Sequence, residues 1–131
     1  MAIEEKQNIL IVEDEAINQL YLSSLFKTNY KTFVAGNSAK ALEIVNKERI
    51  DLILMDISLK GGMNGLQLTQ AIRKIDNYSK TPIIAVTGYA SKDDLEKSLE
   101  AGCNKYITKP FDGIVLTELV SELLNKSHLG E

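Results

Sequence analysis

The stretch Leu52-Ile53-Leu54-Met55-Asp56 places four apolar residues directly before a carboxylate. A short, continuous apolar run is typical of a strand that is covered on both faces, as strands of parallel sheets are. Similar strand-like stretches occur at residues 9–12, 31–35, 82–86 and 106–107. Because segments with helical spacing separate these stretches, the sequence predicts strands that alternate with helices.

Apolar residues recur at helical spacing after each predicted strand. The expected stripes are Ile17, Leu20, Tyr21 and Leu25; Ala41, Leu42 and Val45; Leu68, Ile72 and Ile75; Leu95 and Leu99; and Leu116, Leu119, Val120 and Leu123. Ser91 and Asp112 are typical helix caps, and Gly102 is placed to end a helix. Strands joined by short helical connections pair in parallel with right-handed crossovers. The sequence therefore predicts an α/β fold, a doubly wound five-stranded parallel sheet with helices on both faces.

Length and composition indicate one globular domain. Of the 131 residues, 44% are hydrophobic and 25% are charged, the balance of an ordinary folded protein. We expect a single domain over residues 1–131, with a core from about 8 to 125 and a polar tail over 125–131 that frays. Fifteen basic and eighteen acidic residues give a net charge of −3, which argues against direct binding of nucleic acid.

The sequence also bears on cellular location. The N-terminus has no apolar signal region, and no apolar run approaches the ~20 residues that span a bilayer. Cys103 is the single cysteine, so no intramolecular disulfide can form and the chain could fold in a reducing compartment. We therefore expect a cytoplasmic protein with no membrane insertion, in which Cys103 is a buried apolar side chain.

The residues that follow the apolar runs carry the chemistry. Glu13 and Asp14 follow the first run, Asp56 the third, Thr87 the fourth and Lys109 the fifth. In open parallel sheets the ligand crevice lies beyond the carboxyl ends of the strands. Three neighbouring carboxylates repel one another unless a cation sits among them, and hard oxygen ligands with room for water suit Mg²⁺. A metal-bound carboxylate can attack phosphorus, and lysine and threonine can stabilise the transferring oxygens.

Four segments resemble, in order and spacing, the receiver domain of two-component response regulators. They are residues 11–15, 54–57, 84–88 and 106–111, within a similarity that spans about residues 8–125. The resemblance implies a flavodoxin-like (βα)5 fold with strand order 2-1-3-4-5. It also implies a phosphoacceptor signalling domain of a two-component phosphorelay, with no enzymatic activity beyond its own phosphorylation and dephosphorylation.

The resemblance assigns the central chemistry to Asp56. This residue would accept a phosphoryl group from the phosphohistidine of a histidine kinase or histidine phosphotransfer domain, which gives a 4-aspartylphosphate. The cofactor would be Mg²⁺, bound by Asp14, Asp56 and the backbone carbonyl of Ser58, with Glu13 acting mostly through water. These roles are carried over residue by residue from the matching segments.

Further residues match the family's activation machinery. Lys109 would pair with the phosphoryl group, and the bond from Lys109 to Pro110 would be cis, which X-Pro bonds tolerate. Thr87 and Tyr106 match the switch pair: the Thr87 hydroxyl moves toward the phosphoryl group and Tyr106 rotates into the space it leaves. The surface of the fourth helix, fifth strand and fifth helix would change for a downstream protein, an output domain or a second copy in a phosphorylation-dependent homodimer.

The sequence departs from the common family pattern in one loop. After Asp56 it has Lys60 where a proline is common, and one more residue before the glycine that matches Gly65. Ser58 and Tyr89 stand two residues beyond Asp56 and Thr87, at positions that tune hydrolysis of the phosphoryl group. We expect the bulky Tyr89 side chain to hinder the attacking water and lengthen the phosphorylated lifetime.

Three other functions fit parts of this sequence pattern. A magnesium-dependent phosphatase or phosphotransferase with an aspartyl nucleophile is the main alternative, although the dehalogenase-like type has a second aspartate where Ser58 stands. A flavodoxin-like electron carrier needs a phosphate-binding loop where the acidic Glu13-Asp14-Glu15 lies. A receiver that serves only as a scaffold would not need the five site residues. The sequence names neither the cognate kinase nor the target, and leaves open whether the domain stands alone or belongs to a hybrid kinase.

Overall fold

The structure, a computed structural model, describes residues 5–88 and 91–129. Five strands form one parallel sheet in the order β2-β1-β3-β4-β5. The strands are β1 (Asn8–Val12), β2 (Lys31–Ala35), β3 (Leu52–Asp56), β4 (Ile83–Thr87) and β5 (Lys105–Thr108). The α/β class, the parallel pairing and the strand order 2-1-3-4-5 are confirmed.

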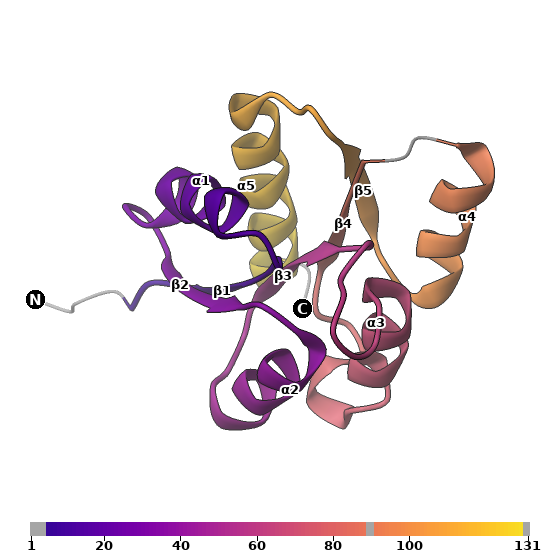
Figure 1. Ribbon diagram of the computed structural model, residues 1–131. Coiled ribbons are helices and arrows are strands. Elements are labelled where there is room, and N and C mark those ends of the chain that lie inside the picture. Colours follow the sequence, from indigo (N-terminus) through magenta and orange to yellow (C-terminus); the bar gives the residue numbers. More distant parts are fainter. Residues whose placement is uncertain (1–4, 89–90, 130–131) are drawn as a thin grey trace, which may run out of the picture.

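Helices cover both faces of the sheet (Figure 1). They are α1 (Ala16–Phe26), α2 (Ser38–Lys47), α3 (Gly65–Arg73), α4 (Lys92–Ala101) and α5 (Gly113–Leu129), with a short 3-10 turn η1 (Asp76–Tyr78) after α3. Helices α1 and α5 lie side by side on one face, and α2 and α3 lie on the other. Among the described residues, no helix is both long and apolar enough to cross a membrane.

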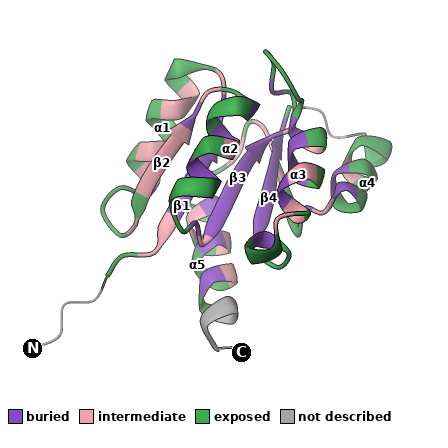
Figure 2. Cartoon of the chain, turned by 90° about the horizontal axis from the view of Figure 1, so that it is seen from below, coloured by how far each residue is buried: buried purple, intermediate pink, exposed green. Residues whose placement is uncertain are grey.

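The packing of β3 on both faces explains the continuous apolar run in its sequence. Leu52 and Leu54 of β3 pack with α1 and α5, whereas Ile53 and Met55 pack with α2 and α3. Successive side chains of a strand point to opposite faces, so a strand covered on both sides must be apolar at every position. Figure 2 shows β3 and β4 buried along their lengths. The sheet is therefore a rigid base for the residues at its carboxyl edge.

The predicted apolar stripe of α1 is wrong except at Leu25, which packs against the core. Ile17 is 79% exposed, and Leu20 and Tyr21 are also exposed, whereas Leu22 is 3% exposed and Phe26 is fully buried. Helix α1 carries apolar residues on more than one face, so periodicity alone could not decide which face meets the sheet. The consequence is an apolar surface on the outside of α1.

The predicted stripe of α4 is also wrong in part. Leu99 lies exposed, and the buried residues of this helix are Ser98 and Ala101. Small side chains at these two positions let α4 approach its neighbours closely, while the longer side chains other than the half-buried Leu95 are exposed. Helix α4 is therefore held by a narrow strip of contacts rather than by a broad apolar face.

The helix ends follow the predicted caps, with one extension. The Asp94 N–H donates to the Ser91 hydroxyl (3.1 Å), and the Ile114 N–H donates to Asp112 Oδ1 (2.8 Å). Gly102 ends α4 with φ +123°, a conformation that favours glycine. Helix α5 continues to Leu129, past the point near residue 125 where we expected the tail to fray. No proline or glycine interrupts the sequence before Gly130, so the polar residues can extend the helix.

Candidate functional site

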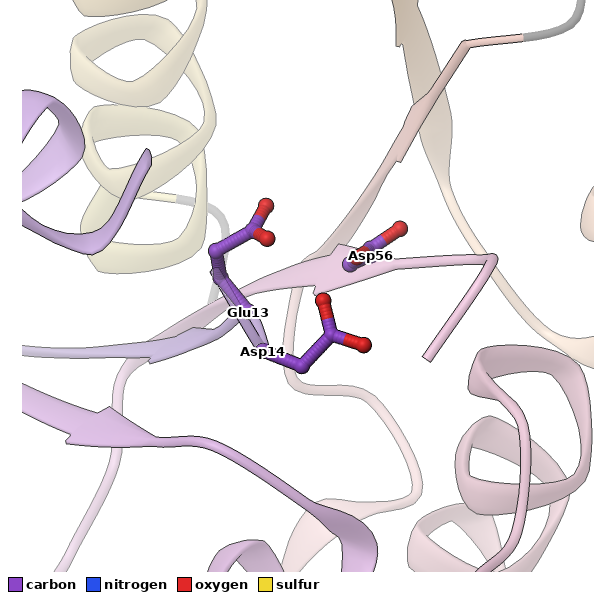
Figure 3. A group of neighbouring side chains, drawn as sticks. All are labelled: Glu13, Asp14 and Asp56. Atoms are coloured by element: carbon purple, nitrogen blue, oxygen red, sulfur yellow. The ribbon is translucent and has the colours of Figure 1, made fainter. Parts of the chain in front are cut away.

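The carboxyl edge of the sheet brings three acidic residues together. Glu13 and Asp14 follow β1, and Asp56 ends β3, the strand hydrogen-bonded to β1. The Glu13 N–H donates to the Ala35 carbonyl (3.0 Å), which continues the β1–β2 ladder one residue past the end of β1. One carboxylate oxygen from each acid lies within 4.8 Å of those of the other two. Figure 3 shows the three side chains gathered at this edge.

The charges in this crevice are not balanced. The Lys109 ammonium lies 3.3 Å from Glu13 Oε1, and the other Glu13 oxygen accepts from the Glu15 N–H (3.0 Å). Both oxygens of this buried carboxylate therefore have donors. One ammonium faces three carboxylates, which leaves an excess of negative charge at Asp14 and Asp56.

The surroundings of Asp56 disfavour its charged form. Its side chain is 5% exposed, and burial raises its pKa above the usual value. The Ser58 N–H, which donates to Asp56 Oδ1 (2.9 Å), and the Lys109 ammonium lower the pKa, while Glu13 and Asp14 raise it. A buried acid that is held near other acids gains from a cation, because a cation removes both the repulsion and part of the desolvation cost.

The three carboxylates form a donor set that fits a hard divalent cation. Carboxylate oxygens are the ligands that Mg²⁺ and Ca²⁺ prefer, whereas structural Zn²⁺ sites are built from cysteine sulfur and histidine nitrogen. Asp14 is half-buried at the mouth of the crevice, which leaves room for metal-bound water. Among the residues that the structure describes, this is the group of acidic, histidine or cysteine side chains that could hold a metal.

Lys109 is positioned by the continuation of the sheet. Its backbone N–H donates to the Thr87 carbonyl (2.8 Å), one step beyond the pairing of Thr87 with Thr108. The peptide bond between Lys109 and Pro110 is cis, as predicted. The end of β5 thus places the Lys109 ammonium against Glu13, which follows β1.

The predicted switch residues lie on β4 and β5, and one of the two predicted tuning residues lies beside Asp56. Thr87 is buried at the last position of β4. Tyr106 lies on β5 and is 42% exposed, in register with Ala85 of β4. Ser58 is exposed beside Asp56, and Tyr89 lies outside the described residues. The side chain of Tyr106 therefore occupies the surface of the edge strand.

Sequence reasoning missed how closely α3 approaches Asp56. A Cβ atom on Gly65, the first residue of α3, would collide with the Asp56 carbonyl and with Ile57. The Gly65 N–H donates to the Ile57 carbonyl (3.2 Å), which fixes the helix start against the end of β3. The only sequence signal was a glycine after Asn64, and the Asn64 side chain forms a capping box with Gln67.

The long loop between β3 and α3 is fastened to α2. Leu59 is buried in the core, and the Met63 N–H donates to the hydroxyl of Ser38 (3.0 Å). Gly61 and Gly62 have φ of +79° and +150°, conformations that side chains rarely adopt. The two glycines thus accommodate the extra residue of this loop, and the chain on both sides of Ser58 is held in place.

Comparison with known proteins identifies the family. Residues 9–121 match the model of the response regulator receiver domain. The chain belongs to this family. It is a receiver domain of a two-component system, with the phosphoacceptor signalling role of such domains.

Curated relatives and solved structures agree with this assignment. The chain is 35% identical to the polar-differentiation response regulator DivK of Brucella anthropi, over 95% of this chain and 98% of DivK. It is also 35% identical to sporulation initiation phosphotransferase F of Bacillus subtilis, over 90% of this chain and 94% of that protein. A receiver domain of a Pseudomonas aeruginosa sensor histidine kinase, with magnesium coordinated in its active site cleft, superposes with a TM-score of 0.84 at 32% identity, covering 92% of this chain and 98% of that chain.

The raised pKa of Asp56 leads to a testable pH dependence. Because this pKa is higher in the folded chain than in the unfolded chain, the folded chain loses stability as pH rises through the raised pKa. We expect Asp56→Asn to stabilise the chain at pH 7.5 in EDTA by roughly 1 kcal/mol, or about 3–5 °C in Tm. The gain should shrink as pH falls toward the range in which carboxyl groups are protonated.

Thermal unfolding followed by circular dichroism measures this effect. Asp76→Asn, at an exposed carboxylate, serves as the matched control and should change Tm little, both at pH 7.5 and at acidic pH. Saturating Mg²⁺ should also remove the difference in Tm between Asp56→Asn and the wild type. A variant that is less stable than the wild type at pH 7.5 in EDTA would contradict the electrostatic account of this site.

Proposed function

We propose that Asp56 is the residue that accepts the phosphoryl group. The observation that carries this assignment is a buried aspartate at the end of β3 that lies against two further carboxylates and within the field of Lys109. An oxygen of Asp56 attacks the phosphorus of a phosphohistidine, the P–N bond breaks, and the imidazole leaves with the electron pair and takes up a proton. The product is an acyl phosphate on the chain and a neutral histidine on the donor.

The residues around Asp56 suit the charge that this transfer brings. Asp14, Asp56 and the carbonyl of Ser58 would hold Mg²⁺, which would neutralise charge on the transferring oxygens. Glu13 would act through water, and this fits the donors that already occupy both of its oxygens. Lys109 is partly exposed, so its ammonium can turn from Glu13 to a phosphoryl oxygen.

The switch that we propose runs from Thr87 to Tyr106. Added negative charge in the crevice attracts the Thr87 hydroxyl, and the exposed Tyr106 ring turns inward into the space that is released. The surface built from α4, β5 and α5 then changes for a downstream partner or a second copy. Ser58 and Tyr89 would set how fast water removes the phosphoryl group, with Tyr89 slowing it.

The enzyme alternative is not favoured. An aspartyl-nucleophile phosphatase of the dehalogenase-like type would need a general acid where Ser58 stands, and family membership points to signalling. The Bacillus subtilis relative is called a phosphotransferase. For this chain we propose that phosphoryl transfer is limited to its own aspartate.

Phosphorylation by a small donor tests the assignment of Asp56. Incubation with acetyl phosphate and Mg²⁺ should add one phosphoryl group, which intact-mass spectrometry detects. The adduct should disappear in Asp56→Asn and persist in Asp51→Asn, at a carboxylate near the opposite edge of the sheet that accepts from the Asn8 N–H. A phosphoryl adduct that still forms on the Asp56→Asn variant would contradict the assignment.

An apolar surface beside the crevice suits the approach of a protein donor. Eight large apolar side chains are exposed in the described part of the chain, and five of them lie on α1 and the start of α5. They are Ile17, Leu20, Tyr21, Ile114 and Val115. A cavity of about 470 Å³, lined by Tyr21 and Phe111 as well as Glu13 and Lys109, connects this surface with the acidic cluster.

We propose that the phosphohistidine donor docks on this surface through an apolar helix face. A donor must bring its phosphorus to Asp56, so it must cover the rim of the crevice, and burial of apolar side chains there stabilises the complex. The ring of Tyr21 packs against Phe111, with centroids 5.8 Å apart. This contact joins α1 to the segment that carries Lys109.

Substitution of two exposed residues separates docking from chemistry. In Ile17→Ser combined with Leu20→Ser, transfer from a phosphohistidine protein that labels the wild-type chain should fall roughly tenfold or more, because hot-spot side chains each contribute about 2 kcal/mol. Labelling by acetyl phosphate should not change. Leu99→Ser, at an exposed leucine of α4, is the matched control, and equal transfer rates in both variants would contradict this docking site.

A further inference from the structure

Arg73 joins α3 to three other segments. Its Nε and Nη2 both donate to the Gly102 carbonyl (3.0 and 2.8 Å). Nη1 donates to the Tyr78 carbonyl (2.7 Å), and Nη2 also donates to Asn104 Oδ1 (2.9 Å). One side chain therefore links the end of α3, the η1 turn, the end of α4 and the residue before β5.

Asn104 extends this connection into the sheet. Its Oδ1 also accepts from the Ile83 N–H at the start of β4 (2.8 Å), and its own N–H donates to the Ile83 carbonyl (2.8 Å). The segment that Arg73 holds is thus bound to the amino edge of the sheet, at the opposite end from Asp56.

The end of α4 is built to receive the guanidinium. The Cys103 N–H donates to the Ser98 carbonyl (3.0 Å) and the Gly102 N–H to the Leu99 carbonyl (3.1 Å), the pattern of a Schellman motif. The carbonyl end of a helix carries partial negative charge, which a cation stabilises. A Cβ on Gly102 would lie 2.9 Å from Arg73 Cγ, so the glycine leaves room for the arginine.

Helix α4 is held at this end and less tightly at the other. Its buried residues, Ser98 and Ala101, both lie in the C-terminal half. The N-terminal residues from Ser91 to Asp94 are exposed, as Figure 2 shows for most of the helix. This loosely packed end is also the one that lies close in the chain to Thr87.

We propose that Arg73 fixes the C-terminal end of α4 as a pivot, so that phosphorylation moves the N-terminal end of the helix and leaves the C-terminal end in place. The proposal rests on the switch at Thr87 described above. A displacement at Thr87 reaches α4 through its N-terminal end, and charge-assisted hydrogen bonds at Gly102 resist movement of the other end. Arg73 is thus a positioning residue for the surface that partners read.

Hydrogen–deuterium exchange of the full chain tests this proposal. The chain is kept in Mg²⁺ with and without excess acetyl phosphate, and intact mass reports the phosphorylated fraction. In the wild type, phosphorylation should change exchange of amides 92–96 and leave amides 98–104 nearly unchanged. In Arg73→Gln, exchange of amides 98–104 should rise about tenfold or more before phosphorylation, and the phosphorylation-dependent change should extend into them.

Two further variants make the test specific. Arg49→Gln removes an arginine whose side chain is 92% exposed and should behave as the wild type. Arg73→Lys keeps the charge and the aliphatic stem but loses the paired donors to Gly102, and it should show the same spread of exchange if Arg73→Gln does not fold. Labelling of Asp56 by acetyl phosphate should be unchanged in each folded variant, because none of these residues lies at the crevice.

The outcomes distinguish the pivot from the switch on which it rests. Changes at both ends of α4 in the phosphorylated wild type, or an Arg73 variant with the wild-type pattern, would overturn the pivot alone. A fully phosphorylated wild type without any change in α4 would overturn both the switch and the pivot. Changes confined to amides 92–96 in the wild type, and spread to 98–104 in the Arg73 variant, support the proposal.

Discussion

Repulsion among three carboxylates at the end of a buried sheet is the constraint on which this molecule depends. Glu13, Asp14 and Asp56 lie within a few ångströms of one another, two of them buried, and Lys109 supplies one opposing charge. Acids in this position would separate if the backbone let them. They are held because the strands that carry them are apolar on both faces and are packed between two layers of helices. Packing of the core thus outweighs the electrostatic repulsion among the three carboxylates. The negative charge that remains favours binding of a cation, and a bound cation in turn favours phosphoryl transfer.

The same architecture connects the site to the surface. Parallel strands deliver Asp56, Thr87 and Lys109 to one edge, so a change of charge there acts on several strand ends at once. Helix α4 begins close in the chain to Thr87 and ends at the Arg73 contact near the opposite edge of the sheet. An element that is firmly held at one end and loosely held at the other can convert a small displacement into a change of orientation. The apolar side chains of α1 lie on the other side of the crevice from α4 (Figure 1), so the donor surface that we propose does not include α4.

Much of the fold was predictable because its signals are local. The run from Leu52 to Met55 is apolar at every position since both faces of β3 are covered. The predicted site residues follow from the rule that the carboxyl ends of parallel strands converge. The face of α1 was mispredicted because Ile17 and Leu20 have the same spacing as a core stripe, and only packing against the sheet and α5 decides between them. Contacts such as Gly65 against Asp56 and Arg73 against Gly102 join residues that no sequence period connects. They had to be seen in three dimensions.

Chemical trapping of the phosphorylated residue tests the central claim most directly. Borohydride reduces an acyl phosphate to an alcohol and so converts a phosphorylated aspartate into homoserine, which tandem mass spectrometry locates in a peptide. After treatment with acetyl phosphate and Mg²⁺, homoserine should appear at residue 56, and EDTA should abolish it. Homoserine at residue 14 or 51, or equal conversion at residue 56 in EDTA, would contradict the account in which the acidic cluster holds a metal that lets Asp56 take the phosphoryl group.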